Sequence, residues 1–322
     1  MCILIFAETW NGKLKKSSFE AVSYGRNLAD KLGLKTTTII FSDSEENFKL
    51  LGDYGSNEVI KYDSIKLENI ENNKLANIIC EISKEKEAKH IIISNTHKGK
   101  SICSKIAFDS ESSLITNAVS LPINYKPLNI KCKAFSSKAF SFYVNKTDKS
   151  VITLLPNAIG HKLNKTSYSV INGNLNIADS SLEFKIIREE KSTNEVSLTD
   201  AERVISAGRG LKGPENWKMI EELAQLINGG TACSKPVSDM GWRPHAEHVG
   251  QTGIAINPDL YIAIGISGAI QHLAGVSGSK KIVVINTDPD APFFKSADYG
   301  IVGDAFEVVP KMIEEIKKIQ DS

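Results

Sequence analysis

The sequence lacks the features that would place the chain in a membrane or on a nucleic acid. No apolar run in its 322 residues approaches the roughly 20 residues that a helix needs to cross a bilayer. Because a strand-like segment already begins at Cys2, we expect no targeting leader. Its 39 Lys and Arg residues balance 38 Asp and Glu residues, so no overall field attracts nucleic acid or an anionic membrane. The five cysteines are scattered without a CxxC pair, which favours buried thiols in a reducing compartment over a disulfide or zinc framework. We therefore expect a soluble cytoplasmic protein.

The first half of the sequence alternates strand-like and helix-like segments. The strand-like segments are 3–6, 36–41, 59–62 and 90–94, and the helix-like segments are 17–32 and 75–82. Ser17 or Ser18 could cap the first helix, and Gly33 ends it. This alternation predicts an α/β fold, in which helices flank a mostly parallel sheet.

The pattern changes between residues 123 and 155. The segments 131–136, 139–144 and 150–155 predict an antiparallel meander appended to the sheet. The polar run from Glu189 to Glu195 makes 189–200 the best linker candidate. At roughly 150 residues per domain, the length also predicts two domains. We therefore expect an N-terminal α/β domain over 1–190 and a second domain with a mostly parallel sheet over 191–322.

One polar turn in the first half follows a buried strand and opens a helix, which is where open parallel sheets hold ligands. It runs from Ser94 to Ser101 and contains His97, but it lacks the GxxxxGK[ST] spacing of a phosphate loop. We interpret it as a solvated turn and assign no chemistry to this half.

A glycine-rich turn opens the second half. The strand 203–207 runs into Gly208-Arg-Gly-Leu-Lys-Gly213, which fits GxGxxG, and a helix over 217–227 follows. This order fits a dinucleotide-binding turn, yet no acidic residue stands about 20 positions further on. A tight turn with a surface Arg209 remains the alternative.

Three further strands of the second half end in small or polar residues. The strand 260–264 leads to Ser267, Gly268 and Ala269, where a helix start would aim backbone N–H groups at a phosphate. The strand 281–285 ends in Asn286, and the segment 298–304 is a further strand exit. We expect the terminal helix to begin at Pro310. Together these strand ends predict one ligand site.

Several stretches of the second half also resemble a known protein family. The matching stretches are 208–212, 249–253, 260–275, 285–286 and 297–302, and the run GISGAIQHLAG over 265–275 is highly specific. They resemble the C-terminal, FAD-binding domain of the electron transfer flavoprotein alpha subunit family, and the first half resembles its N-terminal domain in layout and in the start Ile5-Phe-Ala-Glu8. The resemblance implies a Rossmann-like FAD-binding fold for the second domain.

The resemblance further implies a heterodimer with an electron transfer flavoprotein beta subunit. In the family, dehydrogenases such as the acyl-CoA dehydrogenases of fatty acid β-oxidation reduce the FAD, and a quinone-linked membrane oxidoreductase reoxidises it. The positions matched to FAD binding are Arg209, Ser234, Lys235, Val249, Gly250, Gln251, Thr252, Ser267, Gly268, Ala269, Ile270, Gln271, His272, Asn286 and Asp304.

The family pattern also assigns roles to some of these positions. Thr252 would hydrogen-bond flavin N5, and His272 would lie near the C2 carbonyl, where negative charge accumulates on one-electron reduction. Asn286 and Asp304 fall at the adenosine end. The family usually has Arg where this chain has Lys235, which keeps the charge but loses the planar guanidinium. The neighbouring Cys233 is interpreted as a small buried residue rather than a redox thiol.

An electron carrier has no catalytic residues of its own, and the sequence predicts no metal site. Three alternatives stay open. The first is an electron-bifurcating relative that uses NADH through a second flavin, and the second is a nicotinamide-dependent dehydrogenase built on Gly208-x-Gly-x-x-Gly213. The third is a non-redox nucleotide-binding module, suggested by the layout of the first half.

Overall fold

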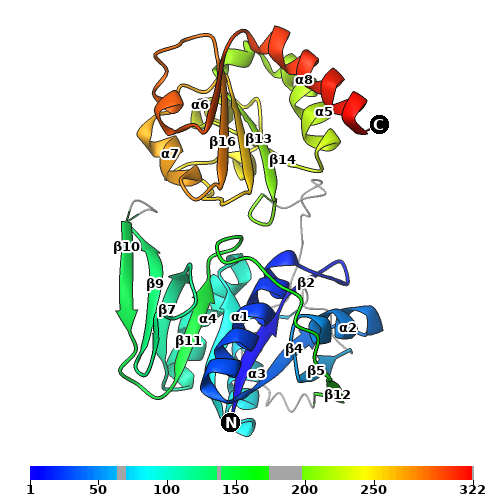
Figure 1. The fold of residues 1–322 in the computed structure, drawn as a ribbon, viewed down its shortest axis with the longest axis vertical. Coiled ribbons are helices and arrows are strands. Elements are labelled where there is room, and N and C mark those ends of the chain that lie inside the picture. The colour runs from blue at the N-terminus through cyan, green and yellow to red at the C-terminus, as the bar shows by residue number, and fades with distance from the viewer. Residues whose placement is uncertain (64–69, 136–138, 174–197, 321–322) are drawn as a thin grey trace. The chain divides into compact units, whose positions relative to one another are not determined.

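The computed structural model describes residues 1–63, 70–135, 139–173 and 198–320, and its contacts divide the chain into two compact units (Figure 1). The first unit is built from β1 to β12 and the second from β13 to α8. Most of the predicted linker lies in 174–197, outside the described residues, so the boundary between domains 1–190 and 191–322 stays a prediction.

The first unit is built on a ten-stranded sheet in the order β10-β9-β7-β11-β6-β1-β4-β5-β12, with β8 beside β9. Its strands are β1 (Cys2–Ala7), β4 (Lys35–Phe41), β5 (Glu58–Tyr62), β6 (Ala88–Ser94), β7 (Ser113–Ala118), β8 (Asn124–Tyr125), β9 (Leu128–Ala134), β10 (Ala139–Val144), β11 (Ser150–Leu154) and β12 (Ser169–Asn172). A separate small hairpin pairs β2 (Thr9–Trp10) with β3 (Lys13–Leu14). Every pairing from β12 to β7 through the middle of the sheet is parallel, which confirms the predicted α/β class.

Helices cover both faces of this sheet because its central strands are apolar on both sides. Along β1, Ile3 and Ile5 face α1 (Lys16–Leu32) and α2 (Glu45–Asp53). Leu4 and Phe6 face α3 (Asn72–Glu85) and α4 (His97–Asp109). Alternate side chains of a strand point to opposite faces, so a continuous apolar run predicts this two-sided burial.

The first helix ends where the sequence predicts, but its start differs from the prediction. Gly33 ends α1 with a φ of 69°, as expected. Neither predicted serine caps its start, however, because the N-cap position is Lys15 and the Ser18 hydroxyl donates to the carbonyl of Glu8 at 2.8 Å. Ser18 therefore fastens the helix to the end of β1.

The predicted meander is correct only at the edge of the sheet. β9 pairs antiparallel with β7 and β8, and β10 lies beyond β9. β11 does not belong to it, because it lies between β6 and β7 and is parallel to both. All five residues of β11 are buried, so its run of β-branched and apolar residues is that of a central parallel strand.

The second unit is a five-stranded parallel sheet in the order β14-β13-β15-β16-β17. Its elements are β13 (Arg203–Ala207), α5 (Lys218–Leu226), β14 (Gly230–Cys233), α6 (Lys235–Asp239), β15 (Leu260–Ile264), α7 (Ile270–Val276), β16 (Lys281–Asn286), β17 (Tyr299–Val302) and α8 (Ala305–Gln320). Figure 1 shows α5 and α8 on one side of the sheet and α7 on the other. This doubly wound order changes winding direction between β13 and β15, which places a ligand crevice at their carboxyl ends.

The start of the last helix was predicted wrongly. α8 begins at Ala305 and not at Pro310, which lies inside the helix. The Asp304 carboxylate accepts a hydrogen bond from the backbone N–H of Phe306 at 3.0 Å and so supports the first turn. Asp304 therefore precedes the first turn of the helix, and the prediction overlooked it because proline is common at helix starts.

Candidate functional site

A cavity of about 710 Å³ lies at the carboxyl ends of four strands of the second sheet. Arg209 follows β13, Ser234 follows β14, Ser267 follows β15 and Asn286 ends β16, and all four residues line the cavity. Because doubly wound sheets bind ligands in crevices at this edge, the cavity is the candidate functional site.

Most of the residues predicted to bind a cofactor line this one cavity, although they come from five separate stretches of sequence. They are Arg209, Ser234, Lys235, Val249, Gly250, Gln251, Thr252, Ser267, Ala269, Gln271, His272 and Asn286. The structure therefore brings together twelve of the fifteen predicted positions.

The three remaining predicted positions lie outside the lining. Gly268 has a φ of +85°, and a β-carbon there would lie 2.6 Å from the backbone Cα of Phe293, so this glycine allows close packing. The Ile270 side chain is exposed at the start of α7. Asp304 starts α8 and lies 3.6 Å from the ammonium of Lys212.

Seven lining residues were absent from the predicted set. They are Gly210, Pro236, Asp239, His248, Gly265, Ile266 and Asp288. Six of the seven lie within five positions of a predicted residue that follows or ends a strand, so strand ends were the signal that could have found them. His248 is the exception, because an isolated β-bridge between the backbones of His248 and Cys233 brings it to the edge of the sheet.

Glycines let the two central strand ends meet at the crevice. The backbone N–H of Gly210 donates to the carbonyl of Gly265 at 3.2 Å. A β-carbon on Gly208 would lie 2.3 Å from that carbonyl oxygen, and one on Gly210 would lie 2.6 Å from the Cα of Gly265. The GxGxxG run therefore serves backbone packing, and it continues as short 3₁₀ turns before α5 rather than as the immediate helix of a dinucleotide fingerprint.

The loop from His248 to Ile254 is held by backbone hydrogen bonds on both sides. The Val249 N–H donates to the Cys233 carbonyl at 3.1 Å, and the Gln251 N–H donates to the Gln271 carbonyl at 2.7 Å. A β-carbon on Gly275 would lie 2.5 Å from the nitrogen of Gly250, so α7 packs directly on the loop. Gln251 and Thr252 are left exposed at the cavity.

An ion-pair cluster anchors the same loop from outside. The Arg243 guanidinium binds both carboxylate oxygens of Glu247, at 2.8 and 2.7 Å, and a carboxylate oxygen of Glu221 on α5 at 2.8 Å. It also lies 5.3 Å from the ring of Trp217. Glu247 is buried and directly precedes His248, so the cluster fixes where the cavity loop starts.

His272 is buried at the cavity in a largely apolar environment. Its Nε2 lies 2.8 Å from the Tyr261 hydroxyl, and its ring contacts Phe293 edge-on at 5.7 Å. Nδ1 is buried and has no hydrogen-bond partner among the described residues. Burial, and to a smaller extent the like charge of His248, lowers the pKa of His272 to about 4, while the Val249 carbonyl acts in the opposite direction. The ring is therefore neutral at pH 7.

Lys235 is the first residue of α6 and is exposed at the cavity. Its ammonium lies 3.1 Å from the carboxylate of Asp239, four residues on. An exposed ion pair of this kind is worth about 0–1 kcal/mol, so the lysine can leave it for a stronger anion.

The donor set of the cavity fits a large anionic cofactor that carries a conjugated ring. Arg209 and Lys235 supply two cationic groups, and Ser234, Thr252 and Ser267 supply hydroxyls. No side chain caps the start of α7, so its first-turn N–H groups are not used by a capping side chain. The unpartnered Nδ1 of His272 adds a buried polar atom that a ligand group could satisfy.

At the corresponding edge of the first sheet, side chains of the chain itself contact one another. Glu8 follows β1 and is buried, and its carboxylate contacts the Thr96 hydroxyl at the start of α4. The ammonium of Lys15 lies 3.4 Å from the same carboxylate. His97 is exposed, as predicted for the turn 94–101.

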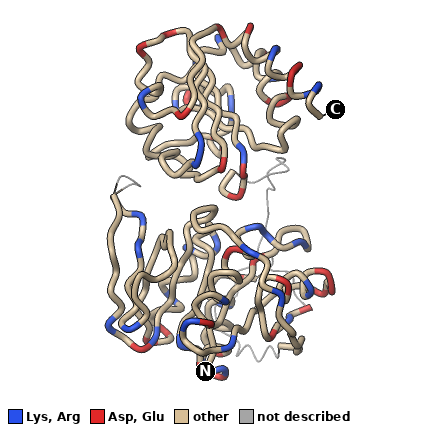
Figure 2. Tube along the Cα trace, in the orientation of Figure 1, with Lys and Arg blue, Asp and Glu red and all other residues tan. Residues whose placement is uncertain are grey.

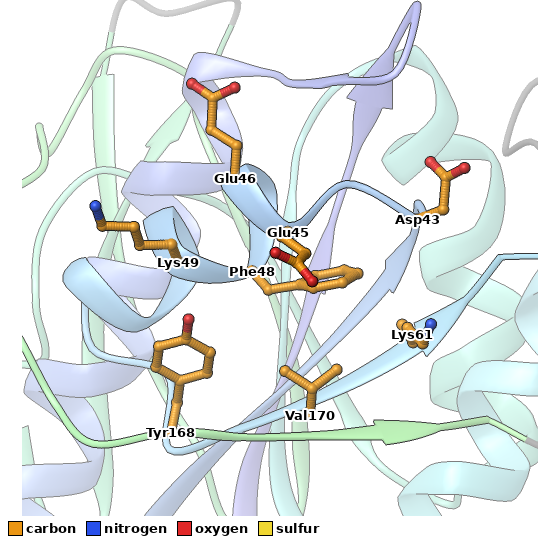
Figure 3. Close-up of a pocket in the computed structure, with 8 residues that line it drawn as sticks. All are labelled: Asp43, Glu45, Glu46, Phe48, Lys49, Lys61, Tyr168 and Val170. Carbon is orange, nitrogen blue, oxygen red and sulfur yellow. The ribbon is translucent and has the colours of Figure 1, made fainter.

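A second cavity, of about 780 Å³, lies between α2 and β12 in the first unit. Figure 3 shows its lining, which is Asp43, Glu45, Glu46, Phe48, Lys49, Lys61, Tyr168 and Val170. Three carboxylates and two ammonium groups surround it, and Lys61 pairs with Asp63 at 2.9 Å. This mixed lining does not point to one ligand class.

Within residues 1–63, 70–135, 139–173 and 198–320, no group of three or more His, Cys, Asp or Glu side chains could hold a metal ion. In the same ranges, no helix is both long and apolar enough to cross a membrane.

Two protein-family models match the chain. The model described as "Electron transfer flavoprotein domain" covers residues 3–171, and the model described as "Electron transfer flavoprotein FAD-binding domain" covers residues 197–277. The second match includes most of the cavity lining.

Curated relatives match over nearly the whole length of the chain. The electron transfer flavoprotein subunit alpha of Thermoanaerobacterium thermosaccharolyticum is 37% identical over 99% of this chain and 98% of its own length. That of Bacillus subtilis is 33% identical over 98% of both chains. The acryloyl-CoA reductase electron transfer subunit beta of Anaerotignum propionicum is 31% identical over 98% of this chain and 95% of its own length.

Proposed function

The chain belongs to the electron transfer flavoprotein family as an alpha subunit, and from that premise we propose that the cavity at the carboxyl ends of β13 to β16 holds its FAD. Proteins of this family are electron carriers without substrate turnover of their own, and FAD is the cofactor of the matched domain. Alpha subunits of the family act together with a beta subunit.

One observation carries the proposal. Twelve residues selected from the sequence as FAD-binding positions line a single cavity, although five stretches between residues 209 and 286 contribute them. A chance assortment of surface positions would not converge in this way. The cavity volume of about 710 Å³ also lies within the range of roughly 300–1,000 Å³ that is typical of cofactor sites.

When bound, FAD supplies the capacity to accept and to donate electrons. The chain supplies binding and electrostatics. Arg209 and Lys235 offset negative charge in the cavity, and the small residues Ser267 and Ala269 let a phosphate approach the start of α7. Asn286 and Asp304 bind at the adenosine end in this assignment, and the Asp304 carboxylate also lies 3.6 Å from the ammonium of Lys212.

His272 and Thr252 bind the ring end of the cofactor in this assignment. His272 is neutral and buried, so it offers a hydrogen bond rather than a fixed positive charge. Thr252 is exposed on the loop that Arg243 and Glu247 anchor, and its hydroxyl is free to turn toward a ring nitrogen.

For electron donors and acceptors, the proposal names dehydrogenases such as acyl-CoA dehydrogenases and a quinone-linked membrane oxidoreductase. The relative from Anaerotignum propionicum supports the acyl-CoA class, because its name assigns it to an acryloyl-CoA reductase. A cytoplasmic location is also part of the proposal, and the free state of all five buried cysteines supports a reducing compartment.

The same relative supports a second candidate, in which the chain serves an electron-bifurcating complex that oxidises NADH. The two candidates share the FAD cavity and differ in what reduces it. Reduction of the flavin by NADH in the purified two-subunit complex would favour bifurcation. Reduction only by an acyl-CoA dehydrogenase with its substrate would favour the simple carrier.

A nicotinamide-dependent dehydrogenase and a non-redox nucleotide-binding module both receive less support. Gly208 and Gly210 pack against Gly265, and so are not free to form the phosphate turn of a nicotinamide enzyme. Glu8 is buried at the edge of the first sheet where a nucleotide module would bind its ligand, and its carboxylate accepts a hydrogen bond from Thr96.

A visible spectrum of the chain purified with its beta subunit tests the proposal. We expect flavin absorption bands and one FAD per alpha subunit at this cavity, which a crystal structure of the complex would locate. A colourless complex, or a nicotinamide in the cavity, would contradict the proposal.

A further inference from the structure

The imidazole of His248 is enclosed by the loop that follows it. Only 2% of this residue is exposed, although it lines the cavity of the second unit. A β-carbon on Gly253 would lie 2.7 Å from its Nδ1, and one on Gly250 would lie 3.3 Å from its Nε2. Because the two glycines leave room for the ring, the loop from His248 to Ile254 is folded around this one side chain.

Backbone hydrogen bonds close the loop around the ring. The Ile254 N–H donates to the His248 carbonyl at 2.8 Å, and the Gly250 N–H donates to the Ile254 carbonyl at 3.2 Å. Gln251 and Thr252 stand between these bonds and are exposed at the cavity. The shape of the closed loop therefore decides where these two side chains point.

The enclosure suits the neutral ring and not the charged one. Nδ1 of His248 is buried and has no hydrogen-bond partner among the described residues. A neutral imidazole can keep its proton on Nε2, whereas an imidazolium carries an N–H at both nitrogens. Protonation would therefore put a charged donor against Gly253 with no acceptor, and a buried donor without a partner is costly.

Most of the charged groups around His248 also oppose its protonation. Burial is the main cause that lowers the pKa of His248; the like charges of His245 and Lys235 lower it further, and Asp239 acts in the opposite direction. The ring of His245 stacks on that of His248 with 5.5 Å between their centres. His272 faces the same loop from α7, because a β-carbon on Gly250 would lie 3.6 Å from its Cα. These groups together favour the neutral ring.

Two other titratable groups lie beside His248. Glu247 directly precedes it, and both oxygens of its carboxylate accept hydrogen bonds from Arg243. Cys233 forms the β-bridge with His248, and burial raises the pKa of its thiol to about 12. Figure 2 shows basic and acidic positions interspersed over the second unit. No field of one sign therefore acts on the ring, and its burial and its immediate neighbours decide its charge.

We propose that His248 is a positioning residue for the cofactor: its neutral ring holds the loop that presents Gln251 and Thr252 to FAD, and protonation of the ring opens that loop. The inference deepens the proposed function and rests on it. The proton comes from water and goes to the second nitrogen of the imidazole, so no electron is transferred in this step. FAD binding is then strongest above the pKa of His248 and weakens as the pH falls below it, because the bound state requires the unprotonated ring.

Hydrogen exchange of the full chain without FAD tests the loop directly. We expect the protection of the Gly250 and Ile254 amides, relative to their intrinsic exchange rates, to fall at least about fivefold between pH 7.5 and pH 5.5. Nitrogen NMR shifts of labelled histidine report the charge of His248 in the same samples, and the two transitions should share one midpoint. The variant His248→Gln cannot gain a proton, so the protection of its loop should change by less than about twofold.

The FAD affinity of the two-subunit complex extends the test to the cofactor. Between pH 7.5 and pH 5.5 the wild type should lose at least about fivefold in affinity, and His248→Gln less than about twofold. His272 adds little in this range, because its pKa is about 4. His245→Gln removes a like charge and should move the midpoint to higher pH. His97→Gln is the matched control, since His97 is exposed on α4 of the first unit, and it should leave the midpoint unchanged.

Three results would overturn the inference. The first is a ring of His248 that stays neutral throughout the titration, and the second is a ring that becomes charged while the loop keeps its protection. Neither needs a variant, so both decide the matter even where His248→Gln folds poorly. The third is an FAD affinity that depends on pH in His248→Gln as it does in the wild type. Failure of the cavity to bind FAD at any pH would instead contradict the proposed function, and the loop titration would remain as described.

Discussion

The Tyr261 hydroxyl lies 2.8 Å from Nε2 of His272, and both side chains are buried. Burial raises the pKa of Tyr261, so its hydroxyl keeps its proton at neutral pH. A neutral imidazole has one donor and one acceptor nitrogen, so the ring proton lies on Nδ1 when the tyrosine hydroxyl donates to Nε2. Tyr261 is therefore a positioning residue for the histidine of the candidate site.

Replacing this tyrosine should release the histidine ring. We expect the ring of His272 to carry its proton on Nδ1 while Tyr261 donates to Nε2, and to lose that preference in Tyr261→Phe. Removing the hydroxyl leaves a buried nitrogen unpaired, which should lower the free energy of unfolding by about 1–3 kcal/mol. Nitrogen NMR shifts of labelled histidine report the tautomer without any bound flavin. An unchanged tautomer in Tyr261→Phe would show that the hydroxyl does not control it.

The buried histidine should make stability depend on pH. The pKa of His272 is about 4 in the folded chain, below the value of 6.5 for an unperturbed histidine. Between these two values the unfolded chain binds a proton that the folded chain does not bind. The free energy of unfolding is therefore highest above about pH 6.5 and falls as the pH falls toward 4.

The variant His272→Gln should flatten this dependence. Between pH 7 and pH 4, the free energy of unfolding of the second unit should fall by up to about 3 kcal/mol less in this variant than in the wild type. Urea titrations read by hydrogen exchange of each unit would measure it. His90→Gln is the matched control, because burial also lowers the pKa of His90 to about 4, and it should change the slope of the first unit only. Equal slopes for wild type and His272→Gln would mean that the buried ring titrates normally.

The contact between Gly210 and Gly265 should be intolerant of a side chain. A β-carbon on Gly265 would lie 2.8 Å from the Cα of Gly210, and the φ of +60° is strained for any other residue. We expect Gly265→Ala to cost about 1–3 kcal/mol from strain, with a further loss from the clash that opens the crevice, and to reduce FAD retention.

Gly33→Ala separates strain from packing. Gly33 has a similar φ of +69°, but nothing lies within 4 Å of a β-carbon built there. It should therefore cost only about 1 kcal/mol and leave FAD retention unchanged. Denaturant titration and the flavin absorption of the two variants provide the comparison. Equal losses in both would show that the glycine contact is not what the crevice requires.

The strand ends of the second unit could be predicted because each signal is local. Ser267 and Asn286 follow or end apolar strands that the sequence marks clearly, and parallel pairing brings such ends to one edge. Gly33 and the two-sided burial of β1 are local signals of the same kind. These elements depend on few partners, so the pattern and the structure agree.

The features that the sequence did not predict depend on contacts between residues that are distant in sequence. β11 follows an antiparallel edge in the chain, yet it inserts between β6 and β7, and only the sheet as a whole decides that. Arg243 and Glu221 are 22 residues apart, and their pairing needs the loop and α5 to be packed first. His248 reaches the cavity through the same loop, so the sequence did not predict it.

Breaking the Arg243 cluster should destabilise the second unit strongly. Arg243→Met leaves the buried Glu247 carboxylate without the guanidinium, and removal of one partner of a buried pair typically costs about 3–5 kcal/mol. Arg243→Met combined with Glu247→Leu should recover most of that loss, because no buried charge remains. Lys317→Met, which breaks an exposed pair with Glu222, should cost less than about 1 kcal/mol. Thermal or urea denaturation measures all three, and a small effect of Arg243→Met would show that water already reaches Glu247.

A carboxylate placed after β15 should exclude the cofactor. Ser267 is exposed at the cavity, between the end of β15 and the start of α7, where the proposed FAD site places a phosphate. Ser267→Asp would set a negative charge against that phosphate, and even a repulsion of about 1.4 kcal/mol reduces affinity tenfold. Ser267→Ala removes the hydroxyl without adding charge, so it should cost about tenfold or less. FAD affinity measured by flavin fluorescence on the two-subunit complex compares the variants directly. Since the side chain is exposed, neither variant should alter folding in the absence of FAD. Tight FAD binding by Ser267→Asp would place the phosphates elsewhere, and the assignment of this strand end would then fail even if the cavity still held the flavin ring.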